Sequence, residues 1–294
     1  MVAGFEDPSC GGAAPGGWRR TLLARTAHDA ARLQRAYAGT AVLTCALWIT
    51  FPIMYRVRQL PVEFPFWTGI DYTHGLTFTA VLLYSFYVTT LVGIANTTMD
   101  AFMATVLYQC KTQLKILRKN LENLAETAAA KSQNWEQFDF VLNQMFINCL
   151  VHYKKIIVTV DLLQGIFGTA ILIQFGIGGW ILCMAAYKIV SLNVLSVEFA
   201  SMALFITCIL TELLLYCYYG NEVQVESDRL VESMYKMQWL GTSVRFQRSL
   251  LVVMERAKRP LRPAAGLIIP LSLETFVKIL KSSYTFYAVL RQTK

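Results

Sequence analysis

Apolar residues are concentrated in five segments of the chain, which more polar stretches separate. The five segments cover residues 36–57, 76–98, 156–186, 194–219 and 267–290. Each approaches or exceeds the roughly 20 apolar residues that cross a bilayer as a helix. The third is long enough to tilt or to extend beyond the bilayer. The pattern predicts an all-α polytopic membrane protein with five spans.

The stretches between the spans are also helical in pattern. Between the second and third spans, leucines recur at intervals of three or four residues and form an apolar helical stripe: Leu114, Leu117, Leu121 and Leu124. A second apolar series follows the fourth span, at Leu230, Met234, Met237 and Trp239. Either stripe alone fits a packed domain or a helix lying on the membrane surface. Two such stripes favour helices that pack against each other.

These patterns divide the chain into four parts. Residues 1–35 are a Gly-rich start followed by a basic segment, and 36–219 form a transmembrane bundle with a helical loop at 99–155. Residues 220–266 are anchor helices below the membrane, and 267–294 contain the last span. Pro260, Pro263 and Pro270 predict a break before that span, because proline interrupts helical hydrogen bonding. One helix is therefore expected to end near Arg259 and the next to begin near Pro270.

The last span carries a polar stripe, which is unusual for a membrane helix. At helical spacing it contains Glu274, Lys278, Lys281, Ser282, Thr285 and Val289. Charged groups inside a bilayer are costly and normally face protein or water. Several copies of the helix around an axis would line a pore, with Val289 as a hydrophobic constriction. The alternative is a stripe that packs against its own bundle, and the pattern alone does not decide between the two.

Composition and charge support the membrane interpretation. The chain is 55% hydrophobic and 16% charged, and its formal net charge is +8. Soluble domains are nearer to one quarter charged, so a soluble all-α protein is disfavoured. Twenty Lys and Arg residues fall before residue 36, in 99–155 or in 220–266, and five fall on the opposite side. The excess predicts an N-terminus inside the cell and a C-terminus outside. The basic residues are spread over three segments, which argues against nucleic-acid binding.

Catalytic and metal-binding patterns are not found in the sequence. The seven cysteines and three histidines have no Cys-x-x-Cys or Cys/His ligand spacing. No Ser/His/Asp set, pair of carboxylates or phosphate-binding loop is evident. We therefore expect neither an enzyme nor a protein with a cofactor.

The C-terminal third resembles the insect odorant receptors. The resemblance rests on YYGNEVQVESDRLVESMYKMQWL and AAGLIIPLSLETFVKILKSSYTFYAVL. Its specific matches are Gly220-Asn221, Glu226-Ser227, Trp239, Ser272-Leu273-x-Thr275-Phe276 and Ser283-Tyr284-x-Phe286. Upstream, from about Arg20, it rests on the order of spans and the character of the loops.

The resemblance implies a receptor subunit for the sense of smell. Members of this family are odorant-gated, nonselective cation channels with seven spans. A specific subunit and a shared co-receptor form a heterotetramer in the plasma membrane of olfactory neuron dendrites, among membrane lipids. The resemblance places Val289 at the constriction of a central pore, with Thr285 and Ser282 on the same lining stripe. Small volatile organic molecules are the expected ligands.

The sequence departs from the family in the number of spans. Five are counted instead of seven, and they correspond to the third through seventh. By location alone, six residues in the outer half of the bundle are candidates for the ligand pocket: Thr44, Trp48, Leu83, Tyr84, Phe199 and Met202. An apolar, aromatic-rich cavity with one or two polar groups suits volatile ligands.

Other functions fit less well. A G-protein-coupled receptor predicts the opposite orientation and two signature motifs that do not occur. A transporter predicts inverted repeats with broken helices in both halves. A gustatory receptor-like chemosensory channel and a non-functional truncated receptor fragment remain the alternatives.

Overall fold

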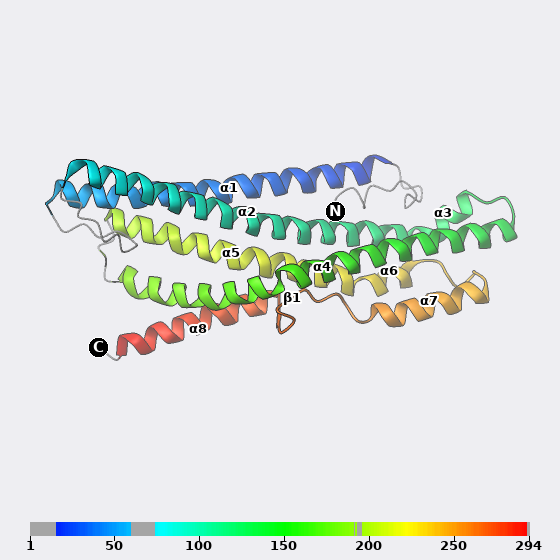
Figure 1. Cartoon of the computed structure of the whole chain (residues 1–294). Coiled ribbons are helices and arrows are strands. Elements are labelled where there is room, and N and C mark those ends of the chain that lie inside the picture. The colour runs from blue at the N-terminus through cyan, green and yellow to red at the C-terminus, as the bar shows by residue number, and fades with distance from the viewer. Residues whose placement is uncertain (1–15, 60–73, 191, 193–195, 293–294) are drawn as a thin grey trace. The chain divides into compact units, whose positions relative to one another are not determined.

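The computed structural model describes residues 16–59, 74–190, 192 and 196–292. Five long helices carry most of this part of the chain: α1 (Gly16–Val57), α2 (Gly75–Glu122), α4 (Trp135–Val190), α5 (Val197–Asp228) and α8 (Leu273–Gln292). Short elements complete it: α3 (Leu124–Ala130), α6 (Leu230–Lys236), α7 (Val244–Ala257), β1 (Ala264–Ala265) and β2 (Ile269–Pro270). Figure 1 shows that α2 and α4 run without interruption. The sequence divided these regions into spans and separate cytosolic helices, whereas the helices are continuous.

Four of the described helices are long and apolar enough to cross a membrane: α1, α2, α4 and the helical region beginning with α5. Between 11% and 33% of the residues in their most apolar windows are buried within the protein. Such apolar outer surfaces are expected where lipid replaces water. Helix α8 has 20 residues, the length of a span, but Glu274, Lys278, Lys281 and Arg291 lower its mean hydropathy. The fifth predicted span therefore exists as a helix, and its position in a membrane stays a prediction.

The described chain forms two compact units. The first, called here the anchor unit, contains 16–30, Ala104–Ile173 and Tyr216–Thr275. The second, called here the span unit, contains the described residues of Ala31–Met103, Gln174–Leu215 and Phe276–Lys294. Each unit has its own core and is described separately.

The anchor unit buries both apolar stripes that the sequence predicts. In the first stripe Leu114, Leu117, Leu121 and Leu124 are all buried. In the second, Leu230, Met234 and Met237 are buried and Trp239 is half-buried. Phe146 of α4 meets Phe246 of α7 edge to face, with 5.2 Å between ring centroids. Leu117 and Leu121 of the first stripe line one small cavity together with Leu230 and Met234 of the second, which is the packing that the two stripes favoured.

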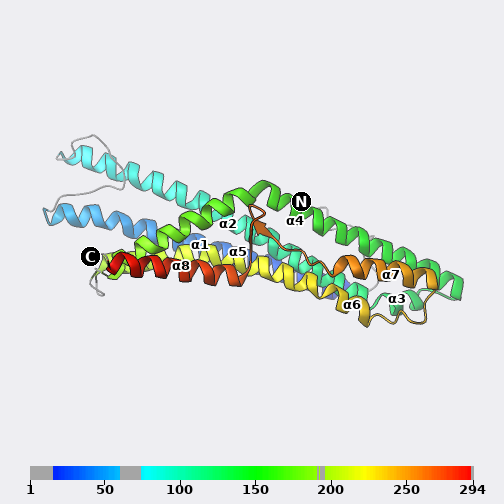
Figure 2. The same cartoon turned by 90° about the horizontal axis from the view of Figure 1, so that it is seen from below.

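A small hairpin occupies the predicted break between α7 and α8 (Figure 2). Strands β1 and β2 pair antiparallel, with Ala265 opposite Ile269. The turn residues Gly266 and Leu267 have φ values of 57° and 62°, as in the tight turns that suit hairpins. The Gly266 amide donates a 2.8 Å hydrogen bond to the carbonyl of Gly168 in α4. The break itself is confirmed, and the hairpin was not predicted.

Two glycines allow the end of this connection to approach the long helices. A Cβ atom at Gly168 would lie 3.2 Å from the Gly266 nitrogen. At Gly220, in α5, a Cβ atom would lie 2.4 Å from Leu271 Cβ and 2.6 Å from the Leu271 carbonyl oxygen. Gly220 belongs to the sequence motif of the C-terminal third, and this close backbone contact explains why that position needs glycine.

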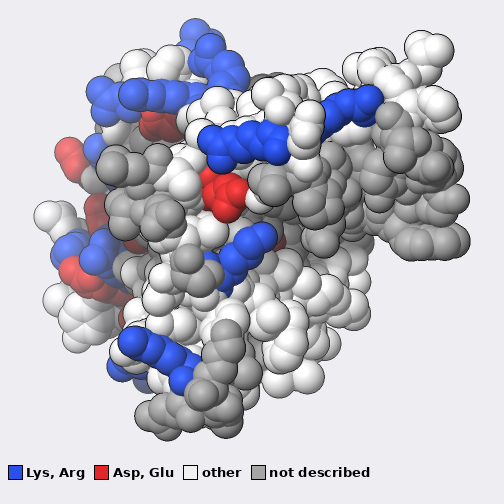
Figure 3. Space-filling model, turned by 90° about the vertical axis from the view of Figure 1, so that its left-hand side faces the viewer, with Lys and Arg blue, Asp and Glu red and all other residues white. Residues whose placement is uncertain are grey.

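Charged side chains are scattered on the face of the molecule shown in Figure 3. Among the described residues of this face, uncharged side chains predominate, and Lys and Arg do not gather into one patch. A nucleic-acid-binding surface normally shows a compact basic patch or stripe. The described residues on the face in Figure 3 form no such patch.

Candidate functional site

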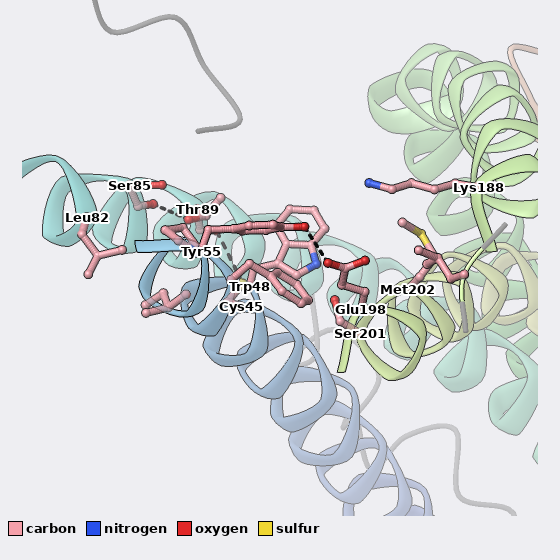
Figure 4. Close-up of a pocket in the computed structure, with 14 residues that line it drawn as sticks. Cys45, Trp48, Tyr55, Leu82, Ser85, Thr89, Lys188, Glu198, Ser201 and Met202 are labelled. Carbon is pink, nitrogen blue, oxygen red and sulfur yellow. Dashed lines mark hydrogen bonds between the residues drawn. The ribbon is translucent and has the colours of Figure 1, made fainter. Parts of the chain in front are cut away.

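A cavity of about 560 Å³ lies within the span unit. Its wall is formed by the C-terminal part of α1, the start of α2, the end of α4 and the start of α5 (Figure 4). Trp48, Phe51 and Tyr55 supply aromatic rings from α1, and Leu82 and Met202 supply aliphatic contacts. The volume falls within the range typical of small-molecule sites, which are mainly apolar with a few placed polar groups.

The polar groups of the cavity include an acidic side chain. The Tyr55 hydroxyl of α1 donates a 2.6 Å hydrogen bond to Oε1 of Glu198 in α5. Glu198 lies in the first turn of α5, where a negative charge is favourable to the helix dipole. The same turn begins at Ser196, whose hydroxyl accepts a 3.0 Å hydrogen bond from the Phe199 amide. Local capping and the bond from Tyr55 together fix the carboxylate at the cavity wall.

Two other polar side chains of the wall form hydrogen bonds with backbone carbonyls. The Thr89 hydroxyl donates to the Ser85 carbonyl one turn earlier. The Cys45 thiol donates to the Thr89 carbonyl over 3.9 Å, which joins α1 to α2. Lys188, at the end of α4, also lines the cavity, and Figure 4 shows its side chain extending toward the cavity from the α4 side.

Of the six predicted ligand-binding residues, some line the cavity and others do not. Trp48 and Met202 line the cavity. Thr44 is buried one turn before Trp48, and its hydroxyl donates to the Thr40 carbonyl at 2.8 Å. Phe199 is half-buried and is not among the lining residues.

Leu83 and Tyr84 lie on another face of α2. Their side chains are 63% and 60% exposed, whereas Leu82 and Ser85 line the cavity. Residues 80–84 of α2 form an unbroken apolar and aromatic run. The sequence therefore named a helix that contributes to the cavity, without fixing which face of that helix lines it.

The polar stripe of α8 is exposed on the described chain. Ser282, Thr285 and Val289 are all exposed, Val289 by 52%. The opposite face of the helix packs on α4, where the buried Ser283 hydroxyl donates a 3.1 Å hydrogen bond to the Gly179 carbonyl. Helix α8 thus docks through Ser283 and presents the stripe outward.

A second polar cluster is buried in the span unit and was not predicted. Asp100 Oδ2 accepts hydrogen bonds from the Tyr37 hydroxyl and the Asn96 amide, each at 3.2 Å. The Gln174 amide donates to Asp100 Oδ1 at 3.1 Å and also to Glu212. The cluster therefore connects α1, α2, α4 and α5. Acidic residues in or beside apolar spans were the available signal for both Glu212 and Glu198, because such residues are rare unless they have a role.

Metal coordination finds no support in the part of the chain that the structure describes. No group of three or more His, Cys, Asp or Glu side chains there could hold an ion. The polar groups of the cavity suit hydrogen bonding to a small ligand.

Comparison with known proteins gives consistent matches. The family model described as 7tm Odorant receptor matches residues 18–284. Odorant receptor 2a of Drosophila melanogaster is 22% identical over 271 residues, which cover 88% of this chain and 66% of the relative. Odorant receptor Or2 of Anopheles gambiae is 23% identical over 275 residues, which cover 93% of this chain and 71% of the relative.

A solved structure is similar over nearly the whole chain. The insect olfactory receptor OR5 from Machilis hrabei, solved in complex with eugenol, superposes with a TM-score of 0.82 at 17% identity. The match covers 95% of this chain and 70% of that receptor. This chain therefore spans about two thirds of the length of the relatives it matches, and it shares their fold.

Proposed function

This chain belongs to the 7tm Odorant receptor family, and on that premise we propose that it binds small volatile odorants in the cavity of Figure 4. The observation that carries the proposal is an aromatic and aliphatic cavity in the span unit with few polar groups. Burial of apolar ligand surface supplies most of the affinity in such a site, and the polar groups fix orientation. The Machilis hrabei receptor of the same fold is described in complex with eugenol, a small volatile molecule.

The proposed signal is an ion current. In this proposal α8 lines a nonselective cation pore through Ser282, Thr285 and Val289, with Val289 at the constriction. The outward stripe of α8 supports it, because charged and hydroxyl groups on a membrane-length helix need a polar environment. A co-receptor supplies the other subunits of a heterotetramer.

The family and the helices make this a multi-pass membrane protein. The proposed location is the plasma membrane of an olfactory neuron dendrite. The basic residues favour an N-terminus inside the cell and a C-terminus outside.

The test co-expresses the full chain with a co-receptor in a cell that lacks both and records odorant-evoked currents. Trp48→Ala removes a large aromatic wall, and it should raise the odorant concentration for half-maximal response by about tenfold or more. Single-channel conductance should not change. Leu91→Ala, at an exposed α2 position outside the cavity lining, serves as the control.

The pore is tested in the same cells with Val289→Trp, which should change conductance or ion selectivity with odorant sensitivity retained. Tyr284→Phe, on the same helix, is the matched control. Unchanged currents in Val289→Trp channels would remove α8 from the pore, whereas an unchanged dose response in Trp48→Ala would remove the cavity from ligand binding.

A further inference from the structure

We propose that the cavity selects neutral odorants that carry a hydroxyl group, and that the Glu198 carboxylate accepts the hydrogen bond from that hydroxyl. Tyr55 positions the carboxylate. The inference rests on the function proposed above, because it assigns a ligand class to the same cavity.

Glu198 has hydrogen-bonding capacity to spare. An ionised carboxylate offers about four lone-pair sites on two oxygens. Oε1 accepts the 2.6 Å bond from Tyr55, and this is the one hydrogen bond that the side chain makes within the described residues. Oε2 is therefore available to a ligand at the cavity wall.

The surroundings make that acceptor selective. Figure 4 shows Glu198 beside Tyr55 and Trp48, whose rings form the adjoining wall. Near apolar rings, a hydrogen bond to a charged oxygen is stronger than the same bond in water. When a ligand removes water from an acceptor and forms no hydrogen bond with it, binding loses the free energy of the lost hydration. A hydrocarbon in the cavity would impose that cost, and an alcohol or phenol would satisfy the oxygen.

Charge balance favours a neutral donor over an ion. An odorant carboxylate would be repelled by Glu198, and an ammonium group would share the cavity with the cationic Lys188. Among the described lining residues, Glu198 and Lys188 carry opposite charges. A neutral hydroxyl compound therefore donates to Glu198 without introducing an unbalanced charge.

Tyr55 acts through Glu198. Its hydroxyl holds Oε1, so that the remaining oxygen keeps one orientation relative to the cavity. With Tyr55→Phe the carboxylate loses this restraint, and the preference for hydroxyl compounds should weaken less than it does when the carboxylate itself is changed.

The experiment uses benzyl alcohol and ethylbenzene, which differ by exchange of a hydroxyl for a methyl group. Their dissociation constants are measured on the full chain, purified with the co-receptor in lipid nanodiscs. The readout is the ratio of the two constants in each protein, so that partition into lipid cancels between variants. In Glu198→Gln the preference for the alcohol should fall about tenfold relative to wild type. Glu255→Gln, an exposed glutamate in the anchor unit, should leave the ratio unchanged.

The outcomes separate the two proposals. If both compounds bind and the ratio is the same in wild type and Glu198→Gln, the hydroxyl inference is wrong and odorant binding stands. A ratio that changes in Lys188→Met and not in Glu198→Gln also overturns it, since Lys188 would then be the recognising group. If neither compound nor any member of an odorant panel binds wild type, the proposed function fails, and the inference fails with it.

Discussion

The anchor unit and the span unit place charge in different surroundings. In the anchor unit, carboxylates meet cations: Arg118 lies 2.6 Å from Glu226, and Lys111 lies 2.5 Å from Glu222. In the span unit, Asp100 accepts hydrogen bonds from a tyrosine hydroxyl and two amides, and Glu198 accepts from a tyrosine hydroxyl. Long helices supply both units, so the difference lies in the side chains.

The two units also differ in how many apolar side chains they expose. Apolar windows of the spans are mostly unburied, and Leu76, Leu91 and Trp180 of the span unit are all exposed. The anchor unit instead buries its leucine stripe from Leu114 to Leu124. Packing against its own side chains stabilises the anchor unit, whereas lipid is expected to cover the span unit.

The largest loss of stability that this comparison predicts follows from substitution of Arg118. This side chain contacts Glu226 and donates a 3.0 Å hydrogen bond to Ser233, and it is only 16% exposed. Arg118→Met leaves Glu226, which is 10% exposed, without that partner. Loss of one member of a buried pair costs about 3–5 kcal/mol. The free energy of unfolding, measured by denaturant titration of the purified chain, should fall by that amount.

The control is the exposed pair of Lys258 and Glu255, whose side chains are 62% and 72% exposed. Lys258→Met should leave the unfolding free energy nearly unchanged, because water already solvates both groups. Equal effects of the two substitutions would contradict the view that paired charges stabilise the interior of the anchor unit.

A pH-dependent effect of about 3 kcal/mol is expected at His152. Burial, followed by the nearby Arg19 and Lys155, lowers the pKa of this anchor-unit histidine from 6.5 to about 4. Its ring lies 3.1 Å from Gln113 Oε1. The folded state binds the proton less readily than the unfolded state, so the stabilisation is complete above pH 6.5 and is lost as the pH falls toward 4.

The measurement is the unfolding free energy from pH 8 to pH 4 for wild type and His152→Gln, in which the residue does not titrate. Wild type should lose more stability on acidification than the variant, with the difference developing below about pH 6.5. Parallel curves would show that His152 does not couple protonation to the fold of the anchor unit.

The smallest of the three effects tests the span unit. Asp100 accepts donors on both carboxylate oxygens. Asp100→Asn turns one oxygen into a donor that faces other donors, and an unsatisfied buried donor costs about 2 kcal/mol. Thermal unfolding in nanodiscs should show a lower midpoint than for Thr98→Ala, a change at an exposed position on the same helix. A midpoint equal to that of the control would show that the cluster contributes little to the span unit.

Much of the fold could be predicted from the sequence, because the spacing of apolar residues indicates which face of a helix is buried. The buried leucines of 114–124 were predictable in this way, and Pro260, Pro263 and Pro270 predicted the break between Ala257 and Leu273. Continuity of α2 and α4 was less visible, since polar residues near the membrane boundary divide one helix into apparent segments. The β1–β2 hairpin has only two residues in each strand, too few for an alternating pattern.

The cavity was only partly predictable for a related reason. In α2 residues 80–84 form an unbroken apolar and aromatic run, so spacing within this run does not distinguish Leu82 from Leu83. Glu198 was recognisable as an acidic residue within an apolar segment, yet its partner Tyr55 lies on a different helix. Contacts between distant parts of the sequence are not encoded in the spacing of either part.

The two glycine contacts of the hairpin have a consequence for biosynthesis. Gly168 and Gly220 are translated well before Gly266 and Leu271, the residues that cover them. The residues of α4 and α5 are therefore synthesised before the residues that contact these glycines. A nascent chain released before Gly266 would therefore lack both contacts and be exposed to quality control.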